Sequence, residues 1–73
     1  MESNSEVARI KQEIIMQNNA ARFALYGSLL GAAKHDFIVK RMEAMSQLKD
    51  NLAQYIGNNE AIEFLVKTMN KEI

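Results

Sequence analysis

The stretch from Ala20 to Ala33 constrains the fold most, because it carries a single charged residue, Arg22, and places small side chains four residues apart. Residues four apart lie on one side of an α-helix, so a second helix can approach closely over a row of small side chains. One row comprises Ala20, Ala24, Ser28 and Ala32, and the next comprises Gly27 and Gly31. The spacing predicts a helix–helix contact and says nothing about a reaction.

The length of the chain favours association with a partner. Its 73 residues suffice for one domain, 1–73, whose single core is marginal against a conformational entropy cost of roughly 1.5 kcal/mol per ordered residue. Disulfides, a metal or a partner chain usually supplement such a core. The sequence has no cysteine and one histidine, His35. A partner chain is the supplement that remains, so we expect a homodimer or a larger bundle.

Charge and composition exclude several classes of partner. Nine basic residues balance nine acidic ones, with a pI near 6.6, so no overall field attracts nucleic acid or an anionic membrane. The missing cysteines fit a cytoplasmic location, and the acidic, polar start is unlike a signal peptide. The weakly charged stretch 20–33 is shorter than the roughly 20 residues that cross a bilayer. We therefore expect a buried helix there and no membrane partner.

An all-α fold follows from the absence of proline and the presence of only three glycines, because turn signals are scarce. A Ser-x-x-Glu capping box, Ser3 with Glu6, predicts a first helix that begins near residue 4 or 5. The doublet Asn18-Asn19 consists of weak helix formers, where a kink can occur. The inward stripe of this helix is Val7, Ile10, Ile14, Ala21, Ala24 and Leu25.

A second apolar stripe with spacings of three and four residues follows, and then a third. The second comprises Ile38, Met42, Met45, Leu48 and Leu52, with Tyr55 or Ile56. Gly57 is the left-handed residue expected to end this helix, and Asn58 or Asn59 is expected to cap the next one. The inward residues expected for the third helix are Ile62, Leu65, Val66 and Met69.

The connection at residues 31–36 allows two folds. If Gly31 ends one helix and Asp36 caps the next, the chain is a helical hairpin of two helices of about twenty residues with a short third helix. Alternatively, one helix runs from about residue 20 to 56 with flanking helices, because Ala32 and Ala33 are good helix formers. We favour the hairpin, since the long helix leaves both stripes without a partner in the same chain.

No residue pattern indicates catalysis, a metal or a cofactor. His35 has Val39 four residues on, where a second metal ligand would stand. The carboxylates are spread singly, without the paired or Glu-x-x-His patterns of acid–base or di-iron sites. Neither a serine nucleophile elbow nor a phosphate-binding loop occurs. We expect a protein that is not an enzyme.

The sequence therefore predicts a small non-catalytic helical protein that acts through protein–protein contacts and self-association, as a structural or adaptor module. The predicted interface residues are Ala24, Leu25, Gly27, Ser28, Leu29 and Gly31. An alternative is a dimeric DNA-associated regulator that presents Lys34, Lys40 and Arg41, although the balanced charge argues against it. A third possibility is a protein that binds an apolar small molecule between its helices.

Overall fold

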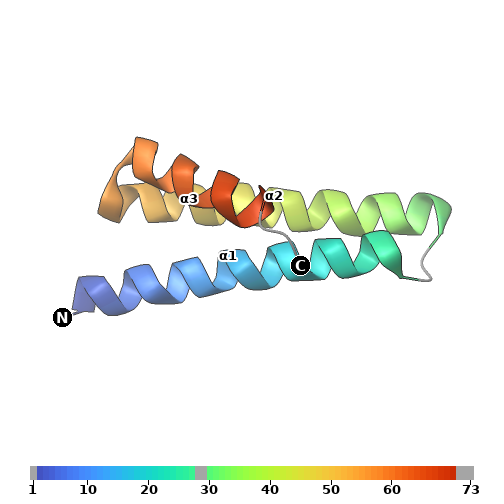
Figure 1. The fold of residues 1–73 in the computed structure, drawn as a ribbon, viewed down its shortest axis with the longest axis horizontal. Helices are drawn as coiled ribbons and strands as arrows, with labels where there is room; N and C mark the ends of the chain where they lie inside the picture. The colour runs from blue at the N-terminus through green and yellow to red at the C-terminus, as the bar shows by residue number, and fades with distance from the viewer. Residues whose placement is uncertain (1, 28–29, 71–73) are drawn as a thin grey trace.

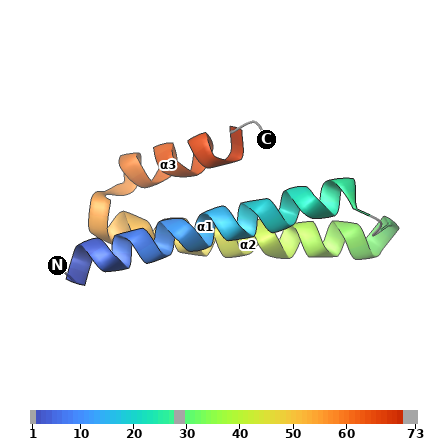
Figure 2. The ribbon, with the colours of Figure 1, turned by 60° about the horizontal axis from the view of Figure 1, so that its bottom comes forward.

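The computed structural model describes residues 2–27 and 30–70, without the side chains of residues 2 and 3. Three helices form: α1 (Glu2–Tyr26), α2 (Gly31–Ile56) and α3 (Asn58–Asn70). The long helices α1 and α2 lie side by side as a hairpin, and α3 folds back along part of it (Figures 1 and 2). The predicted all-α hairpin with a short third helix is confirmed. The alternative of one helix over residues 20–56 is wrong, because α1 ends at Tyr26 and α2 starts at Gly31.

Helix α1 begins earlier than the capping box predicts. It starts at Glu2, so Ser3 lies inside the helix and does not precede it. Its side chain is outside the described part of the chain. Glu6 pairs with Arg9, whose Nη2 donates to Oε2 at 2.6 Å. Helix α1 is also continuous through Asn18, where a kink was considered.

The hairpin turn places its glycine differently from the prediction. The amide of Gly27 donates to the carbonyl of Ala24 at 3.3 Å, just after α1 ends. Leu30 then has an extended backbone, with φ −130° and ψ 155°, and Gly31 opens α2 with φ +63°. Gly31 therefore does not end α1, and Asp36 lies inside α2, so both expectations were wrong. The first residue of α2 has a positive φ, a conformation that favours glycine.

One residue, Gly57, joins α2 to α3. Its amide donates to the carbonyl of Ala53 at 2.9 Å, and its own carbonyl accepts from the amide of Ala61 at 3.1 Å. Its φ of +91° confirms the prediction that a glycine with positive φ ends α2. The prediction that Asn58 or Asn59 caps α3 was wrong, because α3 already begins at Asn58. Gly57 occupies the capping position itself, since its carbonyl accepts the first bond of the new helix.

The core lies where all three helices meet. Val7, Leu48, Ala53, Ile56, Phe64 and Leu65 pack against a buried cluster of Ile10, Ile14, Met45, Leu52 and Ala61. Ala21 and Ala24 are also buried, so the predicted stripe of α1 is confirmed as far as Ala24. Leu25 and Met42 were expected inside, but each is 40% exposed or more. Of the alternatives Tyr55 and Ile56, Ile56 packs on the core and Tyr55 is exposed, so that prediction is confirmed by Ile56. For Leu25 and Met42 the physical reason is that α3 stops before it reaches them.

Helix α3 presents a different face from the predicted one. Ile62 and Val66 are 41% and 48% exposed, whereas Ala61 and Thr68 are buried. The small side chain of Ala61 allows close packing, and the Thr68 hydroxyl donates to the Phe64 carbonyl at 2.9 Å. A hydroxyl satisfied within its own helix can be buried, which the apolar periodicity does not reveal. Of the predicted inward residues, Leu65 packs on the core and Met69 is half-buried.

Candidate interaction surface

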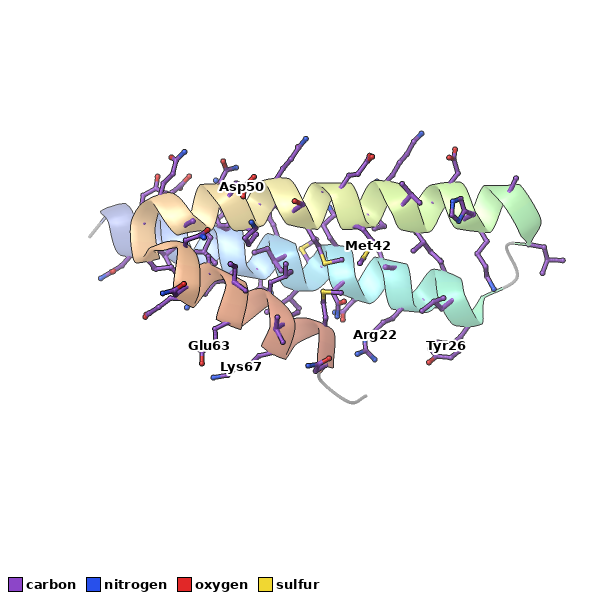
Figure 3. All side chains as sticks on the ribbon, turned by 90° about the horizontal axis from the view of Figure 1, so that it is seen from above. Arg22, Tyr26, Met42, Asp50, Glu63 and Lys67 are labelled. Atoms are coloured by element: carbon purple, nitrogen blue, oxygen red, sulfur yellow. The ribbon has the colours of Figure 1, made fainter. Side chains whose placement is uncertain are left out.

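Two side chains of α1 hold the C-terminal turn of α3. Arg22 Nη2 donates to the carbonyl of Met69 at 2.6 Å, and Asn18 Nδ2 donates to the carbonyl of Thr68 at 3.3 Å. The last carbonyls of a helix have no donor in the helix itself, so these contacts satisfy them. Figure 3 shows α3 ending part-way along the hairpin, with Arg22 close to that end. Asn18 and Arg22 therefore mark the position on α1 where the last turn of α3 is bound.

Beyond this point the groove between α1 and α2 is open. A cleft of about 340 Å³ is lined by Asn18, Ala21, Arg22, Leu25, Tyr26, Ile38, Met42 and Met69. We call this cleft the tip groove. Tyr26 and Met42 lie past the end of α3 in Figure 3. Arg22 is the one charged residue in its lining, and its guanidinium already binds the Met69 carbonyl. The walls of the tip groove are therefore mainly apolar.

Large apolar side chains are exposed at the same end of the hairpin. Phe23, Tyr26 and Leu30 are 80%, 83% and 77% exposed, and Leu25 is half-exposed. Single exposed apolar residues are common on protein surfaces, whereas a gathering of them beside an apolar cleft is typical of an interaction site. We call this end, residues 23–27 and 30–33, the hairpin tip. The hairpin tip and the tip groove together form the candidate surface.

Of the predicted interface residues, the four that the structure describes do not lie together on one helix face. Ala24 is buried within the chain, and Leu25 lines the tip groove. Gly27 and Gly31 are exposed at the hairpin tip. Ser28 and Leu29 are outside the described residues. The expected rows of small residues are interrupted, because the helix ends at Tyr26 and a new one starts at Gly31. An interface at this end of the molecule stays a prediction.

The basic residues of the DNA-binding alternative are partly engaged within the chain. Lys34 Nζ donates to the carbonyl of Leu25 at 3.0 Å and so closes the end of α1. The Arg41 guanidinium lies 4.9 Å from the centre of the Phe37 ring, and its Nε is buried without a hydrogen-bond partner. Lys40 is exposed. Two of the three cations thus have intramolecular roles that compete with contacts to phosphate.

The sequence patterns did not predict that Asn18 and Arg22 hold α3 in place. Asn18 is four residues after Ile14 and three before Ala21, so it stands on the buried stripe of α1. A buried amide needs a hydrogen-bond partner, which is the signal for a contact with another element. The sequence alone does not say that the partner is the carbonyl of Thr68, fifty residues away.

The one pair of charged groups with shifted pKa values in the described residues lies away from the candidate surface. At the other end of the hairpin, the hydrogen bond from Arg9 lowers the pKa of the Glu6 carboxyl and raises that of the guanidinium. Residues 2–27 and 30–70 contain no group of three or more His, Asp or Glu side chains arranged to hold a metal ion. His35 is exposed on α2. None of the helices described is both long and apolar enough to cross a membrane.

The candidate surface is suited to contact with another apolar surface. It combines apolar walls, exposed aromatic rings and one cation that is already hydrogen-bonded. Nothing in its lining supplies a nucleophile beside a base, the arrangement that covalent catalysis requires. Comparisons of the chain with protein-family models, with curated proteins and with solved structures find no match.

Proposed function

We propose that this chain is a non-catalytic helical module that acts by self-association, as a homodimer or a larger helical bundle, in a structural or adaptor role. The observation that carries the proposal is the uncovered half of the hairpin. Helix α3 completes a three-helix bundle at one end, and at the other end α1 and α2 form a pair that α3 does not cover (Figure 2). The tip groove lies beside that pair. Burial of apolar surface yields about 25 cal/mol per Å², so covering this half stabilises the fold.

The shape of the molecule supports the proposal. Its extents are 42 × 22 × 20 Å and its Cα radius of gyration is 13.2 Å, against about 11 Å for a compact chain of this length. The accessible surface is 5319 Å², whereas a monomer of 8.3 kDa is expected to expose about 4,600 Å². The excess is what a long hairpin with an uncovered end exposes. A partner on that end would remove part of it.

The charge balance supports self-association as well. The formal net charge is zero at pH 7, so two copies do not repel each other at long range. Because the chain has no cysteine, its association does not involve disulfides. A chain that needs no disulfide suits the reducing cytoplasm, where we propose that it acts.

Sedimentation equilibrium, together with light scattering after gel filtration, tests the proposal. We expect the mass of a dimer or a larger species at micromolar concentration, and a melting temperature that rises with protein concentration. Raising the salt concentration should not dissociate the complex, since screening weakens charge contacts and leaves apolar burial in place. A folded monomer throughout the concentration range, with a constant melting temperature, would contradict the proposal.

A further inference from the structure

We infer that a second copy of this chain covers the tip groove through a two-fold contact, in which the Phe23 and Tyr26 rings of each protomer pack into the tip groove of the other. The inference rests on the proposed self-association and adds the surface, its symmetry and the residues that form it. Three properties of the surface support it: its shape, its charge and its area.

The shape is self-complementary. The tip groove provides a recess of about 340 Å³, and Tyr26, which lines it, is 83% exposed. Phe23, three residues earlier on α1, is 80% exposed and neighbours Tyr26 on the helix surface, outside the lining of the groove. A two-fold interface uses the same patch on both protomers, and such a patch must carry both a recess and a protrusion. The hairpin tip carries both within a few residues.

The charge pattern selects an uncharged partner surface. Between Glu13 and Lys34 the sequence has one charged residue, Arg22, whose guanidinium already binds the Met69 carbonyl. A charge brought into the tip groove would lose its hydration without gaining a free counter-charge. The hairpin tip of a second copy is an uncharged apolar surface of the kind required.

The outer face of α3 is a poorer match for the groove. Its exposed apolar residues, Ile62 and Val66, alternate with Glu63 and Lys67, which form an ion pair at 3.7 Å. Packing that face into the tip groove would bury the pair or break it, and Figure 3 shows both charged side chains projecting away from the hairpin. The hairpin tip is therefore the surface of this chain that fits the groove best.

The area is sufficient for a stable dimer. An aromatic side chain offers 150–250 Å², so Phe23 and Tyr26 at four-fifths exposure present on the order of 300 Å². With Leu25, Leu30 and Met42 added at their exposed fractions, the surface reaches on the order of 600 Å², the lower end of the range per partner of a standard interface.

Charge substitutions at the surface test the inference directly. We expect Tyr26→Glu and Met42→Glu each to raise the dimer dissociation constant at least about 30-fold, as for residues at the centre of an interface. The matched control is Tyr55→Glu, a half-exposed tyrosine at the far end of α2, which should change the constant less than about 3-fold. Circular dichroism should show unchanged helix content in all three, because each side chain is 40% exposed or more.

Cysteine pairing provides a second readout, in which the signal is a covalent link between two protomers and not a loss of affinity. The chain has no cysteine, so introduced thiols are the only ones present. Mixing Tyr26→Cys protein with Met42→Cys protein under mild oxidation should yield a disulfide-linked heterodimer, which requires Cα atoms within about 7 Å across the contact. A mixture of Tyr55→Cys and Met42→Cys proteins should give none above the background of random collision.

The outcomes separate this inference from the proposed function. A monomeric wild-type protein overturns both the proposed self-association and the tip-groove contact. The same holds if the monomer instead binds phosphatidylcholine vesicles through its hairpin tip. A wild-type dimer that tolerates Tyr26→Glu and Met42→Glu, but dissociates with Val66→Glu, leaves self-association standing and overturns the tip groove as its interface. Dissociation by both tip substitutions, with the Tyr55→Glu control intact and the Tyr26–Met42 cross-link formed, supports the inference.

Discussion

The guanidinium of Arg22 donates to the carbonyl oxygen of Met69 at 2.6 Å, and this bond ties the end of α3 to α1. The C-terminal end of a helix carries partial negative charge, so a cation placed there binds favourably. Lys67, in the last turn of α3, pairs instead with Glu63 on the outer face. The cation at the end of α3 is therefore supplied by another helix, and the contact fixes the last turn of α3 against α1.

Replacing Arg22 with alanine should destabilise the docking of α3 more than the packing of α1 against α2. We expect a loss of about 1–2 kcal/mol in the free energy of unfolding, because a charge-assisted bond to a partly buried carbonyl is removed. Urea denaturation followed by circular dichroism measures the loss, and hydrogen exchange should show lower protection in α3 than in the core of α1. Lys67→Ala is the control, with an expected change within about 0.5 kcal/mol since its ion pair is exposed. Equal losses for the two variants would contradict the capping role.

Gly57→Ala should destabilise the protein although space is available for the new methyl group. A Cβ at this position meets no atom within 4 Å, but φ is +91° and ψ is 158°, a conformation that is essentially restricted to glycine. We expect a cost of about 1–3 kcal/mol, measured by urea denaturation at fixed protein concentration. Gly57→Asn should not restore stability, because asparagine tolerates the left-handed helical region and this ψ lies outside it. Asn59→Ala, exposed in the first turn of α3, is the neutral comparison.

Leu52→Ala should produce one of the largest single losses in the chain. Leu52 is fully buried in the core cluster, so its truncation leaves a cavity among all three helices. We expect a loss of about 2–5 kcal/mol in the free energy of unfolding. Ile62→Ala, at a 41% exposed position of α3, should cost clearly less. If the two substitutions cost the same, Ile62 is buried in solution, and α3 presents a different face from the one described.

The pair formed by Glu6 and Arg9 predicts a pH dependence with a definite sign. The hydrogen bond from Arg9 lowers the pKa of the folded-state carboxyl below its ordinary value of 4.5. The pair's contribution to stability is therefore complete above the ordinary pKa, and it is lost as the pH falls through the lower folded-state value. An NMR titration of the Glu6 carboxyl should show its pKa rising toward the ordinary value in Arg9→Gln. An unchanged pKa would mean that the contact does not persist in solution.

Much of the fold could be predicted from the order of apolar residues. The stripe with Ile10 and Ile14, and the one with Met45 and Leu52, repeat every three or four residues, and both are buried as that repeat requires. Gly57 ends α2 for a reason visible in the sequence, since only glycine readily takes positive φ. These features depend on neighbours within one or two turns, so the chain reveals them locally.

The location of the candidate site was predicted in part. The weakly charged stretch that starts at Ala20 contains the hairpin tip, and Leu25 was named as an interface residue and lines the tip groove. Phe23 and Tyr26 were not among the predicted interface residues, although an aromatic ring is as suited to an interface as to a core. The face of α3 was also mispredicted at Ile62 and Val66, since its orientation is set by the join at Gly57 and by what Ala61 and Thr68 pack against.

The sequence by itself determined the helical class, the two long apolar stripes and the glycine at the end of α2, because each arises from interactions between residues close in the chain. The tertiary structure alone decided how far α3 reaches along the hairpin. Asn18 and Arg22 bind carbonyls about fifty residues away and so fix where the last turn of α3 docks, and no local pattern encodes a contact of that range. The open tip groove exists because α3 ends there, so the candidate interface is a product of the packing of the whole chain.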